Sequence, residues 1–357
     1  MQLYIPTQIY SEPDCVLHHA MEICSYGKKA LIVTGKRSAK ANGSLKDITS
    51  VLKNGHIPYS IFDEIEENPS VETVMKARAF GLQEAVDFVI GVGGGSPLDA
   101  AKAIALMISN PEKTEEILYE NISLPSLPVI AVPTTCGTGS EVTPYAILTL
   151  HNKRTKKSIS HRIFPKLALL DMKYLKCLPC ETLVNTAVDA LAHLIESYLN
   201  TNSNELNRIY SSEGLRMFKK CKNCLQERTF SDVDYNSLLH MSMLGGMAIA
   251  HTGTSLPHGL SYAVTYELSV PHGKAVGIFL GKFMEYYPDE NAAHAVLRLM
   301  GFDCMDDFIN CLKSLTGTVN VENALMENNI TELMKNPAKL KNYPFPLSLE
   351  ELRRYFP

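Results

Sequence analysis

Residues 87–102 read DFVIGVGGGSPLDAAK, and this stretch decides the fold. It predicts a buried apolar strand at 87–91, a turn of consecutive glycines and a helix over 97–109. Ser96 is placed to cap that helix, and Pro97 to be its first residue. Glycines let backbone N–H groups approach a phosphate closely, and a helix N-terminus favours an anion. The segment therefore predicts a pyrophosphate cradle, with a tight turn that holds no ligand as the alternative.

Further buried strands accompany this segment. Apolar runs at 30–34, 128–132 and 167–170 predict three more strands, and residues 70–82 predict a helix. Continuous apolar strands that alternate with helices indicate βαβ units and a parallel sheet covered on both faces.

The second half of the chain has a different character. From about residue 180 onward, the apolar residues follow helical periodicity, and strand-like runs are almost lacking. We therefore expect an α/β N-terminal dinucleotide-binding domain over 1–178 and an all-helical C-terminal domain over 179–357.

A second ligand-binding loop follows the predicted strand at 128–132. Residues 133–141 read PTTCGTGSE, a segment dense in hydroxyls and glycines. Ligands of open α/β sheets bind at the carboxyl ends of strands, and both glycine-containing loops lie at such ends. Two such loops in one domain strengthen the prediction of a bound dinucleotide.

The turn after the strand at 30–34 bears on which dinucleotide is bound. NAD sites commonly place a carboxylate at such a strand end, near the adenosine 2′-hydroxyl. Here residues 35–40 read GKRSAK and offer cations and a hydroxyl instead. The coenzyme residues expected in this turn are Gly35, Lys36, Ser38 and Lys40. The turn therefore predicts NADP(H) in preference to NAD(H), with a solvated basic turn as the alternative.

The predicted helical half carries candidate metal ligands. Asp189 and His193 are four residues apart, so they project from one face of a helix. His258 and His272 follow, each directly before a glycine. One carboxylate and three imidazoles suit a divalent transition metal, either zinc or iron, and such an ion acts as a Lewis acid. Structural histidines are the alternative, but burying these groups in an apolar helix without a partner is costly.

Composition excludes several classes of function. Thirty-four Lys and Arg against 38 Asp and Glu give a net charge of −4, so nucleic acid is not an expected partner. No apolar run approaches the roughly 18 residues of a membrane span, and we expect neither a signal peptide nor a membrane partner. The nine scattered cysteines indicate reduced thiols and a cytoplasmic protein. Cys177–Cys180 and Cys221–Cys224 form CxxC pairs, but their separation is too long for a typical structural zinc site.

Together these residues resemble the iron-containing (group III) alcohol dehydrogenases. GGGSPLDAAKAIA, PTTCGTGSEVTPY, the Asp189/His193 pair and the two His-Gly sites stand in that family's order, from about Leu31 to His272. The resemblance implies the dehydroquinate synthase-like fold, with a metal in the cleft between an α/β domain and a helical domain, near the nicotinamide.

The resemblance also implies residue roles. The metal ligands would be Asp189, His193, His258 and His272, with Fe²⁺ favoured and Zn²⁺ as the alternative. The implied coenzyme residues are Asn68, Gly93, Gly94, Gly95, Ser96, Asp99, Lys102, Thr134, Thr135, Thr138 and a lysine that corresponds to Lys157 or, alternatively, Lys156.

One position departs from the family pattern. Many members carry a histidine four residues after the first His-Gly ligand, and Tyr262 stands there in this chain. Its phenol is the candidate proton relay. The resemblance further implies a homodimer, in which Leu3–Tyr4–Ile5 forms an edge strand that pairs across a two-fold axis.

The expected activity is metal-dependent hydride transfer between NADP(H), or NAD(H), and a small primary alcohol or aldehyde. A glycerol dehydrogenase-like polyol oxidoreductase is the near alternative. A dehydroquinate synthase-like enzyme is disfavoured because its ligand set differs. A non-catalytic metal-binding protein built on the CxxC pairs is the alternative from another class.

Overall fold

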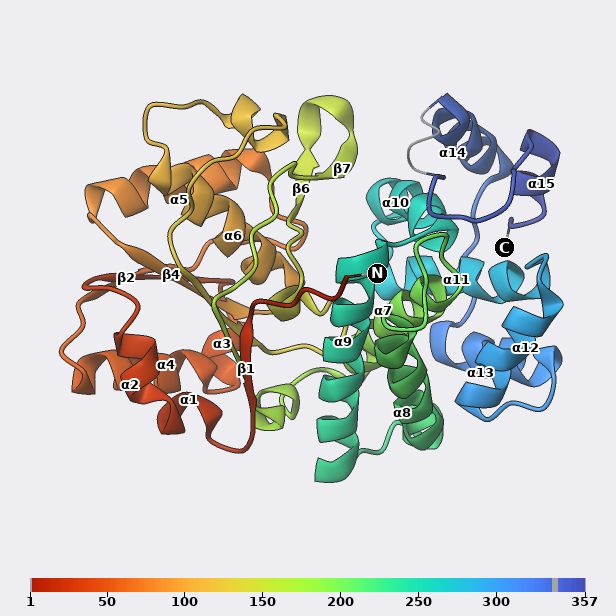
Figure 1. Cartoon of the computed structure of the whole chain (residues 1–357), viewed down its shortest axis with the longest axis horizontal. Coiled ribbons are helices and arrows are strands. Elements are labelled where there is room, and N and C mark those ends of the chain that lie inside the picture. Colours follow the sequence, from red (N-terminus) through yellow and green to blue (C-terminus); the bar gives the residue numbers. More distant parts are fainter. Residues whose placement is uncertain (1, 336–339, 357) are drawn as a thin grey trace. The chain divides into compact units, whose positions relative to one another are not determined.

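A computed structural model describes residues 2–335 and 340–356 of the chain. The described chain forms two units (Figure 1), which we call the sheet unit and the helical unit. The sheet unit comprises Ile5–Thr135 and Ser140–Leu178. The helical unit comprises the chain from Pro179 onward, residues 136–139 and the N-terminal residues up to Tyr4.

The sheet unit alternates strands with helices. Its strands are β1 (Gln8–Ser11), β2 (Ala30–Thr34), β3 (Tyr59–Phe62), β4 (Phe88–Gly93), β5 (Val129–Pro133), β6 (Ile147–Leu150), β7 (Thr155–Ser158) and β8 (Leu167–Leu170). Its helices are α1 (Cys15–His18), α2 (Ala20–Cys24), α3 (Ser38–Ala41), α4 (Ser44–Asn54), α5 (Val71–Gln83) and α6 (Gly95–Ser109), with short 3₁₀ turns at Glu115–Tyr119, Ser140–Val142, His151–Lys153 and Met172–Leu175.

Six strands form one sheet in the order β1-β8-β5-β4-β2-β3, and each neighbouring pair is parallel. The chain leaves β2 toward β3 but leaves β4 toward β5, on the opposite side of the sheet. The turns that follow β2 and β4 are therefore neighbours at a topological switch point, where open α/β sheets bind ligands. Strands β6 and β7 form a separate antiparallel pair.

Strand alternation gives the sheet two apolar faces. Leu31 and Val33 of β2 point into a core shared with α5 and α6, whereas Ala30 and Ile32 point into a core shared with α4. Figure 1 shows these helices on opposite sides of the strands. Because both faces are covered, the central strands are apolar along their whole length.

The helical unit contains only helices as regular elements among its described residues. They are α7 (Cys180–Tyr198), α8 (Arg208–Glu227), α9 (Asp232–Thr252), α10 (Leu256–Leu268), α11 (His272–Glu285), α12 (Glu290–Met300), α13 (Met305–Thr316), α14 (Asn323–Lys335) and α15 (Leu349–Arg353). The expected fold class, a parallel α/β domain followed by a helical one, is confirmed. No described helix combines the length and hydrophobicity needed to cross a bilayer.

One local prediction is wrong. Helix α6 begins at Gly95 with Gly94 as its N-cap, so Ser96 does not cap it and Pro97 is not its first residue. The helix starts earlier because Gly93 adopts a positive φ of 151° and turns the chain at once. Within the described chain Leu3–Tyr4–Ile5 forms no strand, and the Tyr4 N–H donates to His251 Nε2 at 2.9 Å. The pairing of this segment with a second copy across a two-fold axis stays a prediction.

Candidate metal and coenzyme sites

Helix α7 places three ionisable residues on one buried face. Asp189, His193 and Glu196 occupy positions i, i+4 and i+7, which align along a helix. Their side chains are 6%, 7% and 0% exposed, respectively. The residues of α7 between them are buried and mostly apolar, so this part of the helix carries the three groups into the interior of the helical unit.

Three imidazoles converge on one oxygen of Asp189. The Nε2 atom of His193 lies 3.9 Å from Asp189 Oδ1, that of His258 lies at 3.3 Å and that of His272 at 3.8 Å. Asp189 and His193 come from α7, His258 comes from α10 and His272 is the first residue of α11. The structure thus brings all four predicted ligands together.

The opposite ring nitrogen of each histidine is held by another group. His193 Nδ1 donates to the carbonyl of Gly137 at 3.3 Å, and His258 Nδ1 donates to Glu196 Oε1 at 2.5 Å. His272 Nδ1 lies 3.3 Å from the hydroxyl of Thr265. A carbonyl and a carboxylate only accept, so they place the proton of the neutral ring on Nδ1, and that neutral form offers an Nε2 lone pair to a metal.

Buried polar atoms test whether a metal fits here. Asp189 Oδ1 and His258 Nε2 are buried and have no hydrogen-bond partner in the described chain. Asp189, His258 and His272 offer ligand atoms that all lie within 4.8 Å of one another. Ligands about 2.1 Å from one ion stand roughly 3–3.5 Å apart, close to the separations from Asp189 Oδ1. The residues therefore fit a divalent cation.

His193 lies slightly outside the tightest group. Its ring stacks on that of His258 with centroids 4.6 Å apart, and its Nε2 is the farthest of the three from Asp189 Oδ1. His193 as a fourth ligand therefore stays a prediction.

The charges in this cluster are strongly coupled. Burial lowers the pKa of His258, but Glu196 and Asp189 outweigh burial and raise that pKa to about 10. Burial raises the pKa of Asp189, yet His193, His258 and His272 together hold it well below its usual range. Burial also lowers the pKa of His193. Asp189 therefore remains a carboxylate, and a metal that binds at neutral pH must displace the proton of His258.

Gly273 allows α11 to approach α7. A β-carbon at this position would collide with the backbone carbonyl of Asn185 and touch the side chain of Asp189. Only glycine lets His272, the preceding residue, come this close to the carboxylate. The close packing of α11 against α7 thus explains why a glycine follows His272.

One side of the cluster is more open than the other. The His272 side chain is 27% exposed, whereas that of His258 is 3% exposed. Tyr262 lies on α10 one turn after His258, and its ring stacks on His272 with centroids 5.8 Å apart. The phenol therefore lies beside the most accessible ligand.

In the sheet unit, the glycine turn packs tightly. A β-carbon on Gly93 would meet the Pro97 ring, and one on Gly94 would meet the Thr135 side chain. The Ser96 hydroxyl accepts from the backbone N–H of Asn68 at 3.1 Å, which links the turn to the Asn-Pro segment. These predicted coenzyme residues are therefore neighbours.

Of the two candidate lysines on β7, Lys156 lies nearer to these residues. Lys156 Nζ donates to Asn68 Oδ1 at 2.6 Å. The ammonium of the next residue, Lys157, lies over the Tyr119 ring at 4.8 Å. Neighbouring residues of a strand point to opposite faces, so only one of the two can reach Asn68.

Asp99 and Lys102 form an internal network. Lys102 is fully buried, and its ammonium donates to the Ser140 hydroxyl and the Tyr145 carbonyl, both at 2.7 Å. Asp99 accepts from the Ser140 hydroxyl at 2.5 Å and from the backbone N–H of Ile147 at 2.8 Å. In the described chain these contacts connect α6 with Ser140 of the second loop and with the segment that follows it.

The second loop is divided between the two units. Thr134 is buried and its hydroxyl has no hydrogen-bond partner in the described chain, whereas Thr135 is half-buried. Both belong to the sheet unit, and the half-buried Thr138 belongs to the helical unit.

An acidic residue that the sequence did not indicate lies beside the basic turn after β2. Gly35 is half-buried, and the side chains of Lys36 and Ser38 are exposed. Lys40 forms an ion pair with Asp63, which follows the adjacent strand β3, at 2.6 Å. The hydrogen bond from Lys40 lowers the pKa of Asp63.

The cysteines form no metal cluster in the described chain, where the only metal-type group is Asp189, His258 and His272. Cys221 and Cys224 lie on α8, and the Cys224 thiol donates to the Cys221 carbonyl at 3.0 Å. Cys177 is exposed. These thiols do not support a zinc-knuckle function.

Glu196 and Thr265 are site residues that the sequence analysis missed. Each lies two helical turns after a predicted metal ligand: Glu196 is seven residues after Asp189, and Thr265 is seven residues after His258. Extending each helical stripe by one more turn would have found both.

Comparisons with known proteins agree with this geometry. The family model described as iron-containing alcohol dehydrogenase matches residues 6–172. The model for the C-terminal part of the Fe-containing alcohol dehydrogenase family matches residues 183–340.

Individual relatives are similar over most of the chain. The NADPH-dependent butanol dehydrogenase of Clostridium saccharobutylicum is 28% identical over 320 residues, covering 86% of this chain and 82% of the relative. The lactaldehyde reductase of Escherichia coli (strain K12) is 29% identical over 267 residues, covering 73% and 69%. The crystal structure of an iron-containing alcohol dehydrogenase from Thermotoga maritima is 36% identical, with a TM-score of 0.92 and coverage of 99% and 98%.

The hydrogen bond from His258 to Glu196 predicts proton-coupled metal binding. Because the pKa of His258 is about 10, bound metal displaces one proton, and the apparent Kd for Zn²⁺ should fall about tenfold per pH unit between pH 6 and 8. Glu196→Gln should weaken the affinity roughly 10- to 100-fold at pH 8 and flatten this dependence. Competition with a chromophoric chelator measures both quantities.

Glu332→Gln, the same substitution on the exposed face of α14, serves as the control and should leave the affinity unchanged. Equal metal affinity and an equal pH slope in wild type and Glu196→Gln would show that Glu196 does not act on the site.

Proposed function

We propose that this chain, which belongs to the iron-containing alcohol dehydrogenase family, transfers hydride between NADP(H) and a short primary alcohol or its aldehyde. The observation that carries the proposal is the convergence of three imidazole Nε2 atoms on one buried carboxylate oxygen. We assign Asp189, His193, His258 and His272 as the metal ligands. Fe²⁺ is favoured by the family, and Zn²⁺ also accepts this donor set.

The chain's residues prepare this chemistry. When bound, the metal ion supplies Lewis acidity toward the substrate oxygen, and the nicotinamide supplies or accepts the hydride. Asp189 contributes a fixed negative charge, and the Nδ1 partners hold the imidazoles in the tautomer that leaves Nε2 unprotonated. The open side at His272 is the side from which a substrate enters.

Tyr262 is proposed to relay the proton of the alcohol. Its ring is parallel to that of His272, so its phenol lies beside the most accessible ligand. A phenol both donates and accepts a hydrogen bond, which allows it to pass a proton between the substrate oxygen and water.

The proposed coenzyme site uses the turns of the sheet unit. Gly93, Gly94, Gly95 and Ser96 provide backbone N–H groups at the start of α6, which suit a pyrophosphate. Lys156 and Asn68 extend the site along β7. Asp99 and Lys102 act on it indirectly, because they hold Ser140, near the end of the second loop.

A preference for NADP(H) is proposed from the turn after β2. Gly35 removes the strand-end carboxylate of many NAD sites, and exposed Lys36 and Ser38 suit a 2′-phosphate. Asp63 lies near this turn, and its negative charge would repel a 2′-phosphate. Its ion pair with Lys40 reduces that repulsion. The similarity to an NADPH-dependent butanol dehydrogenase supports the same coenzyme and a short aliphatic substrate.

Metal reconstitution tests this proposal. Protein stripped of metal and restored anaerobically with Fe²⁺ or Zn²⁺ should oxidise NADPH with short aldehydes, and unrestored protein should be inactive. His272→Ala should lose bound metal and turnover together, and the control His294→Ala, at an exposed position of α12, should lose neither. Metal content by mass spectrometry and NADPH absorbance are the measurements.

The outcomes of this experiment are distinct. Faster turnover of glycerol than of short aliphatic alcohols would assign the polyol alternative. NADPH oxidation that proceeds without metal would overturn the mechanism.

Gly35→Asp tests the coenzyme assignment. A carboxylate at the end of β2 should repel a 2′-phosphate, so the ratio of kcat/KM for NADPH to that for NADH should fall at least about tenfold. A β-carbon here meets the Ile65 carbonyl at 3.3 Å, so Gly35→Ala is the steric control. An unchanged ratio in Gly35→Asp would exclude this turn from the 2′-phosphate site.

Tyr262→Phe tests the proton relay. Phenylalanine keeps the ring that stacks on His272, so metal content should stay at the wild-type level. Turnover should fall roughly 10²-fold or more, and the pH profile of kcat should change, because the phenolic hydroxyl is gone. Wild-type kcat across the pH range would rule out the relay.

A further inference from the structure

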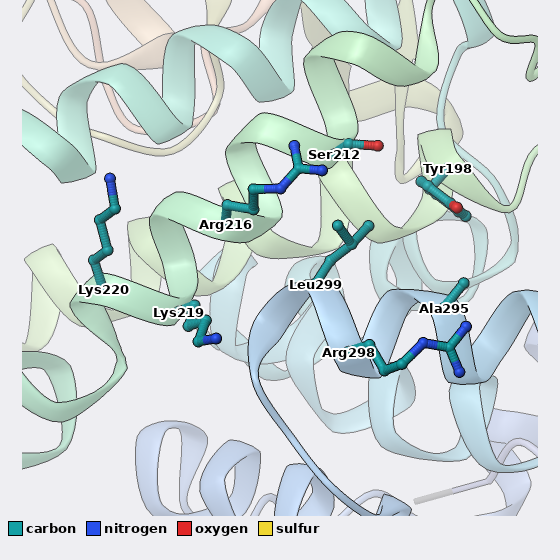
Figure 2. Close-up of a pocket in the computed structure, with 8 residues that line it drawn as sticks. All are labelled: Tyr198, Ser212, Arg216, Lys219, Lys220, Ala295, Arg298 and Leu299. Carbon is teal, nitrogen blue, oxygen red and sulfur yellow. The ribbon is translucent and has the colours of Figure 1, made fainter.

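A hollow in the helical unit is lined by four cationic side chains. It lies between α8, α12 and the C-terminal end of α7 and has a volume of about 760 Å³. Figure 2 shows Arg216, Lys219 and Lys220 on one helix and Arg298 on another. None of these residues belongs to the metal cluster.

The spacing on α8 produces this concentration of charge. Ser212, Arg216, Lys219 and Lys220 occupy positions i, i+4, i+7 and i+8, which share one helical face. Arg298 adds a fourth cation from the last turn of α12. Because the whole chain carries more acidic than basic residues, this cluster is not a consequence of composition.

Acidic residues do little to neutralise the group. Arg216 lies 3.3 Å from Glu213, in a pair whose side chains are half exposed to solvent. Across residues 2–335 and 340–356, Lys219, Lys220 and Arg298 have no carboxylate within 4 Å. The positive charge of these side chains is therefore largely unneutralised, and an anion of two or more charges would be attracted to it.

Packing fixes one of the cationic side chains, and part of the lining of the hollow is apolar. The methylene carbons of Lys219 pack against Gly301, where a β-carbon would collide with them, so this side chain is held in place. Ala295, Leu299 and Tyr198 add apolar surface, and the guanidinium of Arg208 lies 4.9 Å from the centre of the Tyr198 ring. Cations beside apolar surface suit a ligand with both phosphates and a planar portion.

We propose that this hollow binds a diphosphate-bearing ligand, with the phosphates held by Arg216, Lys219, Lys220 and Arg298. Its volume accommodates a nucleoside diphosphate, whose base would lie against Tyr198 and Leu299. This site is separate from the proposed coenzyme turn and does not depend on the proposed dehydrogenase activity.

Calorimetric titration with ADP and with inorganic pyrophosphate tests this site. NADPH is left out, because it carries a diphosphate and would compete for the hollow; binding at the proposed coenzyme turn is common to all variants and is subtracted. At the hollow, the wild-type protein should bind each probe in a 1:1 complex that weakens steeply as salt is added. The triple variant Arg216→Gln/Lys219→Gln/Arg298→Gln should bind at least about tenfold more weakly, because it loses three exposed charge–phosphate pairs.

A matched variant controls for net charge. Lys53→Gln/Lys113→Gln/Lys313→Gln removes three exposed lysines elsewhere and should bind like the wild type. Both triple variants change only exposed side chains, and circular dichroism checks that they fold.

Each outcome bears on the proposal. Tighter binding of ADP than of pyrophosphate assigns a nucleotide ligand, and equal binding assigns a free diphosphate. No saturable binding at millimolar concentration and low salt overturns the proposal. Equal binding by the wild type and the Arg216→Gln/Lys219→Gln/Arg298→Gln variant overturns it as well.

Discussion

The helical unit depends on one buried negative charge, that of Asp189. A carboxylate in an apolar interior is stable only if it is paired or coordinated. Three helices therefore converge on it: α7 carries it, α10 contributes His258 and α11 begins with His272. The close approach of α11 requires the missing side chain of Gly273. Electrostatics and packing thus act on the same few residues.

Much of the fold could be predicted from the sequence because the central strands are buried on both faces. The runs at 30–34 and 167–170 coincide with β2 and β8, and β4 and β5 lie within two residues of their predicted bounds. Strands β1 and β3 were missed because they are short edge strands whose exposed residues interrupt the apolar pattern. The start of α6 was also wrong, since a glycine turn leaves little side-chain signal at a helix boundary.

The site was predictable only in part. The spacing of Asp189 and His193 follows from helical periodicity alone, but a sequence without a resemblance to a known family cannot pair them with His258 and His272. Glu196 was missed because a glutamate in a helix usually faces solvent, and only the tertiary structure shows it fully buried against His258. Asp63 was missed because strand pairing brings it beside the basic turn.

Two other buried ionisable groups show how Asp189 differs from a residue with a purely structural role. Lys102 is fully buried, but hydroxyls and a carbonyl satisfy its ammonium. Burial raises the pKa of Glu141 to about 7, so this carboxyl can lose its charge by taking up a proton. Asp189 differs from both, because the imidazoles around it hold its pKa low and its Oδ1 has no hydrogen-bond partner in the described chain. Without a metal its charge is balanced by these imidazoles, chiefly His258, whose pKa is about 10. A divalent cation that displaces the His258 proton would take over this role, so the cluster fits a metal site.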